Sequence, residues 1–237
     1  MTNTVAETNT SYYDQNVRRS GFSSTHRYLL EHIAPNTTVL ELGPASGYMT
    51  KALAAKGCLV DAIELNAHDA ANAAPYCRNM IVGSVEDLEN FSGLAAAYDV
   101  ILLADVLEHL RTPENVLQKV RQFMAPDGVA LVSLPNIAYW KMRLELLRGR
   151  FEYVDSGLLD RTHLRFFTLK TGKAMFTRAG FDIVRIAAPP PTTPRFGRLK
   201  ERVKNAWPTL FSIQFIFHLR FNPDNPELNK NIIFNRE

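Results

Sequence analysis

The sequence is poor in cysteine and has no long apolar run. Cys58 and Cys77 are its two cysteines, too few for a disulfide framework, and their spacing fits no metal-binding motif. No apolar run approaches the ~18 residues that a membrane helix requires. Residues 1–11 lack the basic and then apolar pattern of a secretory signal. We therefore expect reduced thiols and a cytoplasmic protein.

The excess of basic over acidic residues is confined to a single segment. The net charge is only +3, and residues 195–204 hold five basic side chains against one acidic one. Apolar residues at 196, 199, 203 and 207 have the spacing of one helical face. Two interpretations stay open: a helix on the anionic inner face of a membrane, or a helix packed on the sheet edge. No dedicated nucleic-acid motif occurs, so nucleic acid is not an expected partner. The basic residues are Arg195, Arg198, Lys200, Arg202 and Lys204.

Strand and helix patterns alternate along most of the chain. This alternation predicts βαβ units, a parallel sheet and a doubly wound α/β fold in one domain, 1–237. The domain comprises an arm and helix (1–34), a core (35–189), and an appended helix with a last strand (190–237). The expected strands are 38–42, 59–65, 79–82, 98–103, 129–134, 181–186 and 212–221. The expected helices are 26–33, 48–56, 68–76, 139–150, 169–179 and one that begins after Thr112, and a turn is expected at 126–128.

A turn rich in small residues follows the first expected strand. Gly43, Ala45 and Gly47 leave room for a ligand close to the backbone, next to a helix N-terminus. Glu64 ends the next strand, 21 residues after Gly43, where its carboxylate can accept hydrogen bonds from a ribose diol. A dinucleotide site would need a glycine at position 48, which is Tyr48, so the spacing disfavours NAD. A tight turn without any ligand is the remaining alternative.

These residues resemble the class I S-adenosylmethionine-dependent methyltransferases. The first motif of that family, acidic-x-Gly-x-Gly-x-Gly, is matched by Glu41, Gly43 and Gly47, with Ala45 in place of the middle glycine. The second acid falls on Glu64, the adenine loop on 83–87, the fourth strand and its turn on 98–109, and the fifth strand on 131–136. The resemblance covers about residues 25–186. It implies a mostly parallel seven-stranded Rossmann-like sheet with a C-terminal antiparallel strand.

The resemblance also implies a cofactor, S-adenosylmethionine, and a product, S-adenosylhomocysteine. Ser84 departs from the family, because many members have an acid at this position. The expected cofactor-binding residues are Glu41, Gly43, Pro44, Ala45, Gly47, Tyr48, Glu64, Leu65, Ser84, Val85, Glu86, Ala104, Asp105 and His109.

His109 and His163 are the expected catalytic residues, together with Arg165. His109 closes an Asp-x-x-Glu-His sequence, and some quinone-pathway and RNA 3′-end methyltransferases that look similar here bind a divalent metal at such a group. We expect no metal; the alternative set is Asp105, Glu108 and His109. His163 lies in an irregular segment, where it acts either as a general base on the acceptor or as a structural hydrogen-bonding group. Arg161 and Arg165 could hold a phosphate or carboxylate.

Four segments resemble a narrower bacterial group that is associated with glycosyltransferases of surface-polysaccharide synthesis. That resemblance implies O-methylation of a sugar hydroxyl, and a glycosyltransferase as a partner. Two alternatives stay open: a methyltransferase for quinones or secondary metabolites, and a non-catalytic cofactor-binding partner of a glycosyltransferase. Residues 139–143 could form a lid over the acceptor. The four segments are 133–136, 149–153, 159–168 and 207–211.

Overall fold

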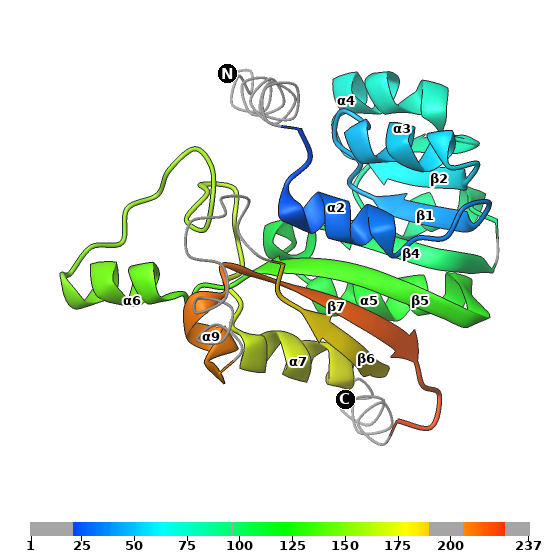
Figure 1. Cartoon of the computed structure of the whole chain (residues 1–237). Coiled ribbons are helices and arrows are strands. Elements are labelled where there is room, and N and C mark those ends of the chain that lie inside the picture. The colour runs from blue at the N-terminus through cyan, green and yellow to red at the C-terminus, as the bar shows by residue number, and fades with distance from the viewer. Residues whose placement is uncertain (1–20, 96, 190–205, 226–237) are drawn as a thin grey trace, which may run out of the picture.

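The computed structural model describes residues 21–95, 97–189 and 206–225 of the chain (Figure 1). A seven-stranded sheet runs through it in the order β3-β2-β1-β4-β5-β7-β6. The first five strands in this order pair in parallel, whereas β7 is antiparallel to both of its neighbours. The predicted doubly wound sheet with a C-terminal antiparallel strand is therefore confirmed. The strands are β1 (Thr38–Leu42), β2 (Leu59–Glu64), β3 (Asn79–Val82), β4 (Tyr98–Ala104), β5 (Met124–Pro135), β6 (Phe181–Ala187) and β7 (Gln214–Phe221).

Helices cover both faces of the sheet, as the alternating sequence pattern requires. Figure 1 shows α2, α3 and α4 on one face, and α5 and α7 on the other. Two short helices, α6 and α9, lie beside the end of β5. The helices are α2 (Ser24–Glu31), α3 (Tyr48–Ala55), α4 (Ala67–Ala73), α5 (Pro113–Val120), α6 (Trp140–Leu147), α7 (Leu169–Arg178) and α9 (Pro208–Phe211).

Side chains that alternate along the strands divide the core into two layers. Val39 of β1 packs with the layer that α2 and α3 cover, where Leu29 and Leu53 are fully buried. Leu40, the next residue, packs with the opposite layer, which includes Val116 of α5 and Phe176 of α7. Both layers exclude water, so the central strands are held rigidly and their carboxyl ends form a fixed edge for a site.

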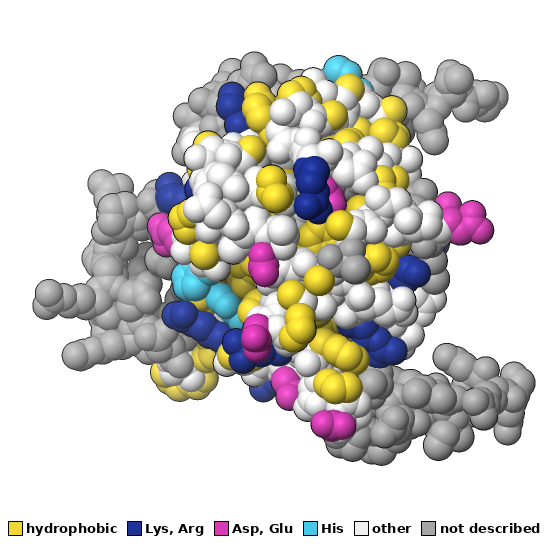
Figure 2. Space-filling view, turned by 90° about the vertical axis from the view of Figure 1, so that its right-hand side faces the viewer, with side chains coloured by type: hydrophobic (Ala, Val, Ile, Leu, Met, Phe, Trp, Pro, Cys, Tyr) yellow, Lys and Arg dark blue, Asp and Glu magenta, His cyan; other side chains and the backbone are white. Residues whose placement is uncertain are grey.

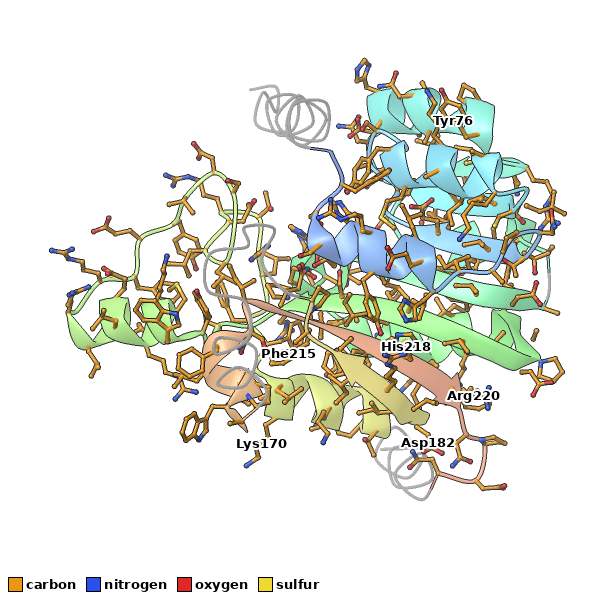
Figure 3. All side chains as sticks on the ribbon, viewed as in Figure 1. Tyr76, Lys170, Asp182, Phe215, His218 and Arg220 are labelled. Atoms are coloured by element: carbon orange, nitrogen blue, oxygen red, sulfur yellow. The ribbon has the colours of Figure 1, made fainter. Side chains whose placement is uncertain are left out.

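β7 lies between β5 and β6 and has buried residues along most of its length. Phe215 is buried in the interior, and Arg220 is exposed towards the end of the strand (Figure 3). Asn136, fully buried after β5, donates hydrogen bonds to the carbonyl oxygens of Thr209 (2.9 Å) and Ser212 (2.7 Å). These bonds fix α9 against the carboxyl end of β5.

The structure corrects some of the predicted elements. The expected turn at 126–128 lies within β5, whose pairing with β4 slips between Tyr98 and Val100, so the strand accommodates these residues as an irregularity. The expected helix 68–76 ends as an α-helix at Ala73 and continues as a 3₁₀ turn, Ala74–Tyr76, around Pro75, which has no amide hydrogen to donate. Thr112 precedes α5 as predicted, but no side-chain cap forms. Its hydroxyl donates to Glu86 instead.

The predicted basic helix at 195–204 lies outside the described residues. Within the described part of the chain, no helix has the length and apolarity to cross a bilayer. Figure 2 views the molecule from the side that is on the right in Figure 1, and basic and acidic side chains are interspersed there among apolar ones.

Candidate active site

The turn between β1 and α3 has an unusual backbone. Gly43, Ala45 and Gly47 all have positive φ angles, of 66°, 48° and 78°. At Gly47 a Cβ atom would lie only 2.6 Å from the Cα of Ala73, so glycine is required there twice over, by conformation and by space. Ala45 adopts the left-handed conformation although it carries a Cβ, which costs about 1 kcal/mol. Such strain is maintained where the surrounding structure fixes the backbone for a ligand.

Glu64 fixes this turn from the neighbouring strand. One carboxylate oxygen, Oε2, accepts a hydrogen bond from the amide of Ala45 at 2.9 Å, and Oε1 accepts one from the amide of Asn66 at 2.8 Å. Burial raises the pKa of Glu64, although these amide bonds oppose the shift. A carboxylate has about four lone-pair sites, so Glu64 can still accept a bond from a ribose hydroxyl. The turn and this acid thus fit an adenosine-type ligand.

Glu41, the acid of the first motif, is only 3% exposed. Its Oε2 accepts a hydrogen bond of 2.7 Å from the hydroxyl of Thr50, which is fully buried. Burial raises the pKa of Glu41 to about 7, and the charge of Glu64 contributes in the same direction. Glu41 is therefore only partly ionised at neutral pH, so its attraction for a cofactor cation is weaker than that of a fully ionised carboxylate.

The residues expected beside the adenine are buried or form hydrogen bonds that stabilise their own loop. Val85 is buried, and Ser84 Oγ accepts a bond of 3.1 Å from the amide of Glu86. Glu86 Oε1 accepts bonds from both the amide (2.7 Å) and the hydroxyl (2.9 Å) of Thr112, which ties this loop to the start of α5. Leu65, 72% exposed, is available to cover a flat ring.

Ala104 and Asp105 follow at the carboxyl end of β4, as predicted. Asp105 has a φ of 57°, and its Oδ1 accepts hydrogen bonds from Ser133 Oγ (2.7 Å) and from the amide group of Gln214. The hydroxyl of Tyr48 lies 3.2 Å from Nε2 of His26 on α2. Sequence reasoning missed Gln214 and His26, because no local pattern places β7 or α2 beside the end of β4.

A short 3₁₀ turn after β4, Leu107–His109, supports the segment between α6 and α7. The carbonyl oxygen of Glu108 accepts bonds from the amides of Leu164 (2.8 Å) and Arg165 (2.9 Å). Figure 1 shows this segment as the long excursion between α6 and α7. The anchoring brings His163 to His109, with 4.8 Å between their ring centroids. The structure thus joins two expected catalytic residues that lie 54 positions apart.

Both imidazoles are oriented by backbone carbonyls. Nδ1 of His109 lies 3.2 Å from the carbonyl oxygen of Thr162, and Nδ1 of His163 lies 3.3 Å from that of Leu158. A carbonyl oxygen only accepts, so each Nδ1 carries the proton and each Nε2 keeps a lone pair. Burial lowers the pKa of His109, and the neighbouring His163 adds to this effect.

Glu108 completes this group. Its side chain is 1% exposed, and its Oε2 atom has no hydrogen-bond partner among the described residues. Burial raises the pKa of Glu108 well above its usual range, with a further contribution from Asp105. One donor atom each of Glu108, His109 and His163 lies within 4.8 Å of the other two. This group differs from the predicted alternative metal set, because His163 stands where the sequence suggested Asp105.

The arginines of the segment are directed elsewhere. The guanidinium of Arg165 donates to the carbonyl oxygen of Arg111, and Nε of Arg161 donates to Asp155 at 3.1 Å. An anion-holding role of Arg165 therefore stays a prediction. Phe167 is buried, whereas Phe166 packs beside His163 with 6.3 Å between ring centroids.

Comparisons with known proteins agree with this geometry. Residues 13–186 match the family described as a methyltransferase domain. A ubiquinone biosynthesis O-methyltransferase from Rickettsia canadensis is 24% identical over 179 residues, which are 71% of this chain and 69% of that protein. One of the same name from Psychrobacter arcticus is 26% identical and is matched over 72% and 69%. The alignments with proteins of this name from Rickettsia prowazekii and Rickettsia typhi span 46% and 41% of those proteins.

Solved structures share the fold. A TehB-like SAM-dependent methyltransferase from Corynebacterium glutamicum superimposes with a TM-score of 0.60 at 13% identity, over 91% of this chain and 99% of that one. Magnesium protoporphyrin IX methyltransferase from Synechocystis, crystallised with S-adenosylhomocysteine, gives 0.56 at 14% identity, over 94% and 89%. The family match spans most of the chain, and the turn that it includes has the shape and the acid for an adenosine ligand. The chain thus belongs to the class I S-adenosylmethionine-dependent methyltransferases.

Proposed function

We propose that the protein methylates a hydroxyl oxygen of a small-molecule acceptor of the phenol or quinol class. The observation that carries this proposal is the pair of imidazoles at the carboxyl end of β4. His109 and His163 each keep an Nε2 lone pair, while their Nδ1 atoms are held by carbonyls. A hydroxyl must lose its proton as it is methylated. The site therefore needs a neighbouring group that accepts this proton or stabilises the negative charge that develops on the oxygen.

One set of residues would bind the cofactor, and another would align the acceptor. The strained turn at Gly43, Ala45 and Gly47, with Glu64, would hold the cofactor. The cofactor supplies an activated methyl group on a sulfonium. The protein aligns the acceptor, whose oxygen bonds to the methyl carbon as the carbon–sulfur pair of electrons stays on sulfur and the hydroxyl proton passes to the histidine side of the site.

Aromatic side chains favour a ring-shaped acceptor. Phe166 lies between His163 and a small exposed cluster in which Phe151 and Tyr153 are 41% and 44% exposed. Stacking on such rings suits a phenol or quinol. The curated relatives are named for O-methylation in ubiquinone biosynthesis, which is chemistry of the same class. The names of these relatives do not support a sugar acceptor or a glycosyltransferase partner, so the expected sugar acceptor serves as the comparison in the assay.

The test is methyl transfer from labelled cofactor to a panel of catechols, quinols and nucleotide sugars. We expect turnover on the phenolic compounds, and a loss of about 100-fold or more in kcat for His163→Gln with the cofactor affinity unchanged. His68→Gln, at an exposed histidine on α4, is the matched control and should retain full activity. Turnover confined to nucleotide sugars would overturn the acceptor class. Tight cofactor binding without transfer to any acceptor would favour a non-catalytic role.

A further inference from the structure

We infer that Glu108, His109 and His163 form a binding site for a divalent transition-metal ion, on which the acceptor oxygen is held. The site is assembled from two segments, the 3₁₀ turn after β4 and the excursion before α7. Their donor atoms lie within 4.8 Å of one another, so small side-chain rotations would bring all three to the ligand distances of about 2.0–2.2 Å of a single ion. The part of the inference that concerns the acceptor rests on the proposed function, whereas the metal site itself does not.

The orientation of the two histidines supports a metal site. Ligating histidines characteristically donate the other ring N–H to a carbonyl or carboxylate, which fixes the tautomer and leaves one nitrogen to the metal. His109 and His163 both have this arrangement, with Nδ1 on the carbonyl oxygens of Thr162 and Leu158. Neither Nε2 forms a hydrogen bond with another described residue. Packing alone does not require two neighbouring histidines whose Nδ1 atoms are both held by backbone carbonyls.

The buried carboxylate is the second, independent observation. Glu108 Oε2 is shielded from solvent and has no partner among the described residues, although leaving a buried polar atom unpaired is energetically costly. Asp160 is also only 1% exposed, and its Oδ2 likewise has no partner among those residues. No described lysine or arginine forms an ion pair with either acid. A bound cation would give Glu108 Oε2 the partner it lacks and would favour the ionised form of that carboxyl group.

The ligand set indicates the class of ion. Two imidazole nitrogens and one carboxylate oxygen suit zinc, iron, cobalt or manganese rather than calcium or magnesium, which favour oxygen ligands. Three protein ligands also leave positions open for water or for a substrate oxygen. A hydroxyl bound there loses its proton to solvent more readily, because the cation stabilises the resulting anion. With the ion bound, the Nε2 atoms of His109 and His163 would act on the acceptor through the ion instead of accepting its proton directly.

Binding of the metal alone provides the first test. The full-length protein is freed of metal with a chelator and titrated with Co²⁺ and Zn²⁺, with calorimetry for affinity and visible absorption for Co²⁺ coordination. We expect one ion per chain, a Co²⁺ spectrum typical of nitrogen and oxygen ligands, and a raised unfolding temperature. Glu108→Gln, His109→Gln and His163→Gln should each weaken binding at least about tenfold. His68→Gln is the control and should bind as the wild type does.

Several outcomes would overturn the site. These are the absence of stoichiometric binding, and equal affinity in the wild type and the three variants. Far-ultraviolet circular dichroism verifies that each variant folds. If one does not fold, histidine nitrogen resonances of the wild type decide instead, since only the Nε2 signals of His109 and His163 should move on Zn²⁺ binding.

Methyl transfer provides the second test. Transfer should fall at least about tenfold in chelated protein and return on adding metal, while calorimetric cofactor affinity stays the same. Transfer that is indifferent to chelation would overturn the acceptor role of the ion. Stoichiometric metal binding without transfer to any acceptor would count against the proposed function and leave the metal site standing.

Discussion

The carboxylate of Glu64 accepts a hydrogen bond of 2.9 Å from the backbone amide of Ala45. The last residue of β2 thereby holds the turn that follows β1 in its left-handed conformation. We therefore expect two roles for Glu64, since the same carboxylate is the expected partner of the ribose hydroxyls. Substitution at this position should affect the conformation of the turn as well as the binding of the cofactor.

Glu64→Ala should weaken cofactor binding by about 1–3 kcal/mol, because the charged acceptor for the ribose is lost. It should also lower the stability of the protein without cofactor, because the amides of Ala45 and Asn66 lose their partner. Glu64→Gln keeps one acceptor oxygen, so its effect on stability should be smaller than that of alanine. Calorimetry with S-adenosylhomocysteine and chemical denaturation separate the two effects. Glu31→Gln, at an exposed position on α2, is the control. Wild-type affinity in Glu64→Ala would remove this residue from the cofactor site.

Gly47→Ala should destabilise the protein far more than Gly149→Ala. Both glycines have similar φ angles, 78° and 73°, so the conformational cost of a Cβ is nearly the same, about 1–2 kcal/mol. At Gly47 the new atom would meet Ala73 of α4, whereas nothing lies within 4 Å at Gly149. The overlap should add about 1–3 kcal/mol, measured by urea denaturation. Equal losses in the two variants would show that the β1–α3 turn can move away from α4.

The sequence predicts the fold well, because strands and helices leave local signals. The alternation of strand and helix patterns sufficed to predict the sheet, and the small residues at 43–47 predicted the turn that follows β1. Contacts between segments far apart in the chain leave no local sequence pattern. The pairing of Glu108 with the 160–165 segment, which brings His163 to His109, depends on backbone hydrogen bonds that any residue could form. The position of Arg165 is unpredictable for the same reason, since its partner is the carbonyl of Arg111.

Arg78→Ala should cost about 2–4 kcal/mol of stability, although Arg78 lies far from the proposed site. Its guanidinium binds both oxygens of Asp61, at 2.8 Å and 2.6 Å, and Asp61 is 1% exposed within β2. The hydroxyl of Tyr98 would be the remaining side-chain donor, at 2.5 Å. Arg148→Ala, which removes an exposed pair with Glu145, should cost less than about 1 kcal/mol. Thermal unfolding compares the two, and a similar small loss in both would mean that Asp61 finds water as a substitute.

Glu41→Gln should change how stability depends on pH. Burial raises the pKa of Glu41 to about 7 from 4.5, so the folded state holds a proton that the unfolded state releases between these values. The wild type should therefore lose up to about 3 kcal/mol of stability from Glu41 as the pH rises from 4.5 to above 7. Glutamine cannot ionise, and its amide oxygen can still accept the bond from Thr50. The stability of Glu41→Gln relative to that of the wild type should thus increase as the pH rises.

Chemical denaturation of both proteins at pH 5, 6.5 and 8 measures this difference, and contributions from titrating groups that do not interact with Glu41 cancel in the comparison. Glu31→Gln is again the control, because the exposed carboxylate of Glu31 remains in water in both states. A difference between wild type and Glu41→Gln that stays constant across this range would mean that Glu41 is ionised throughout. In that case its negative charge would be fully available to attract the sulfonium of the cofactor.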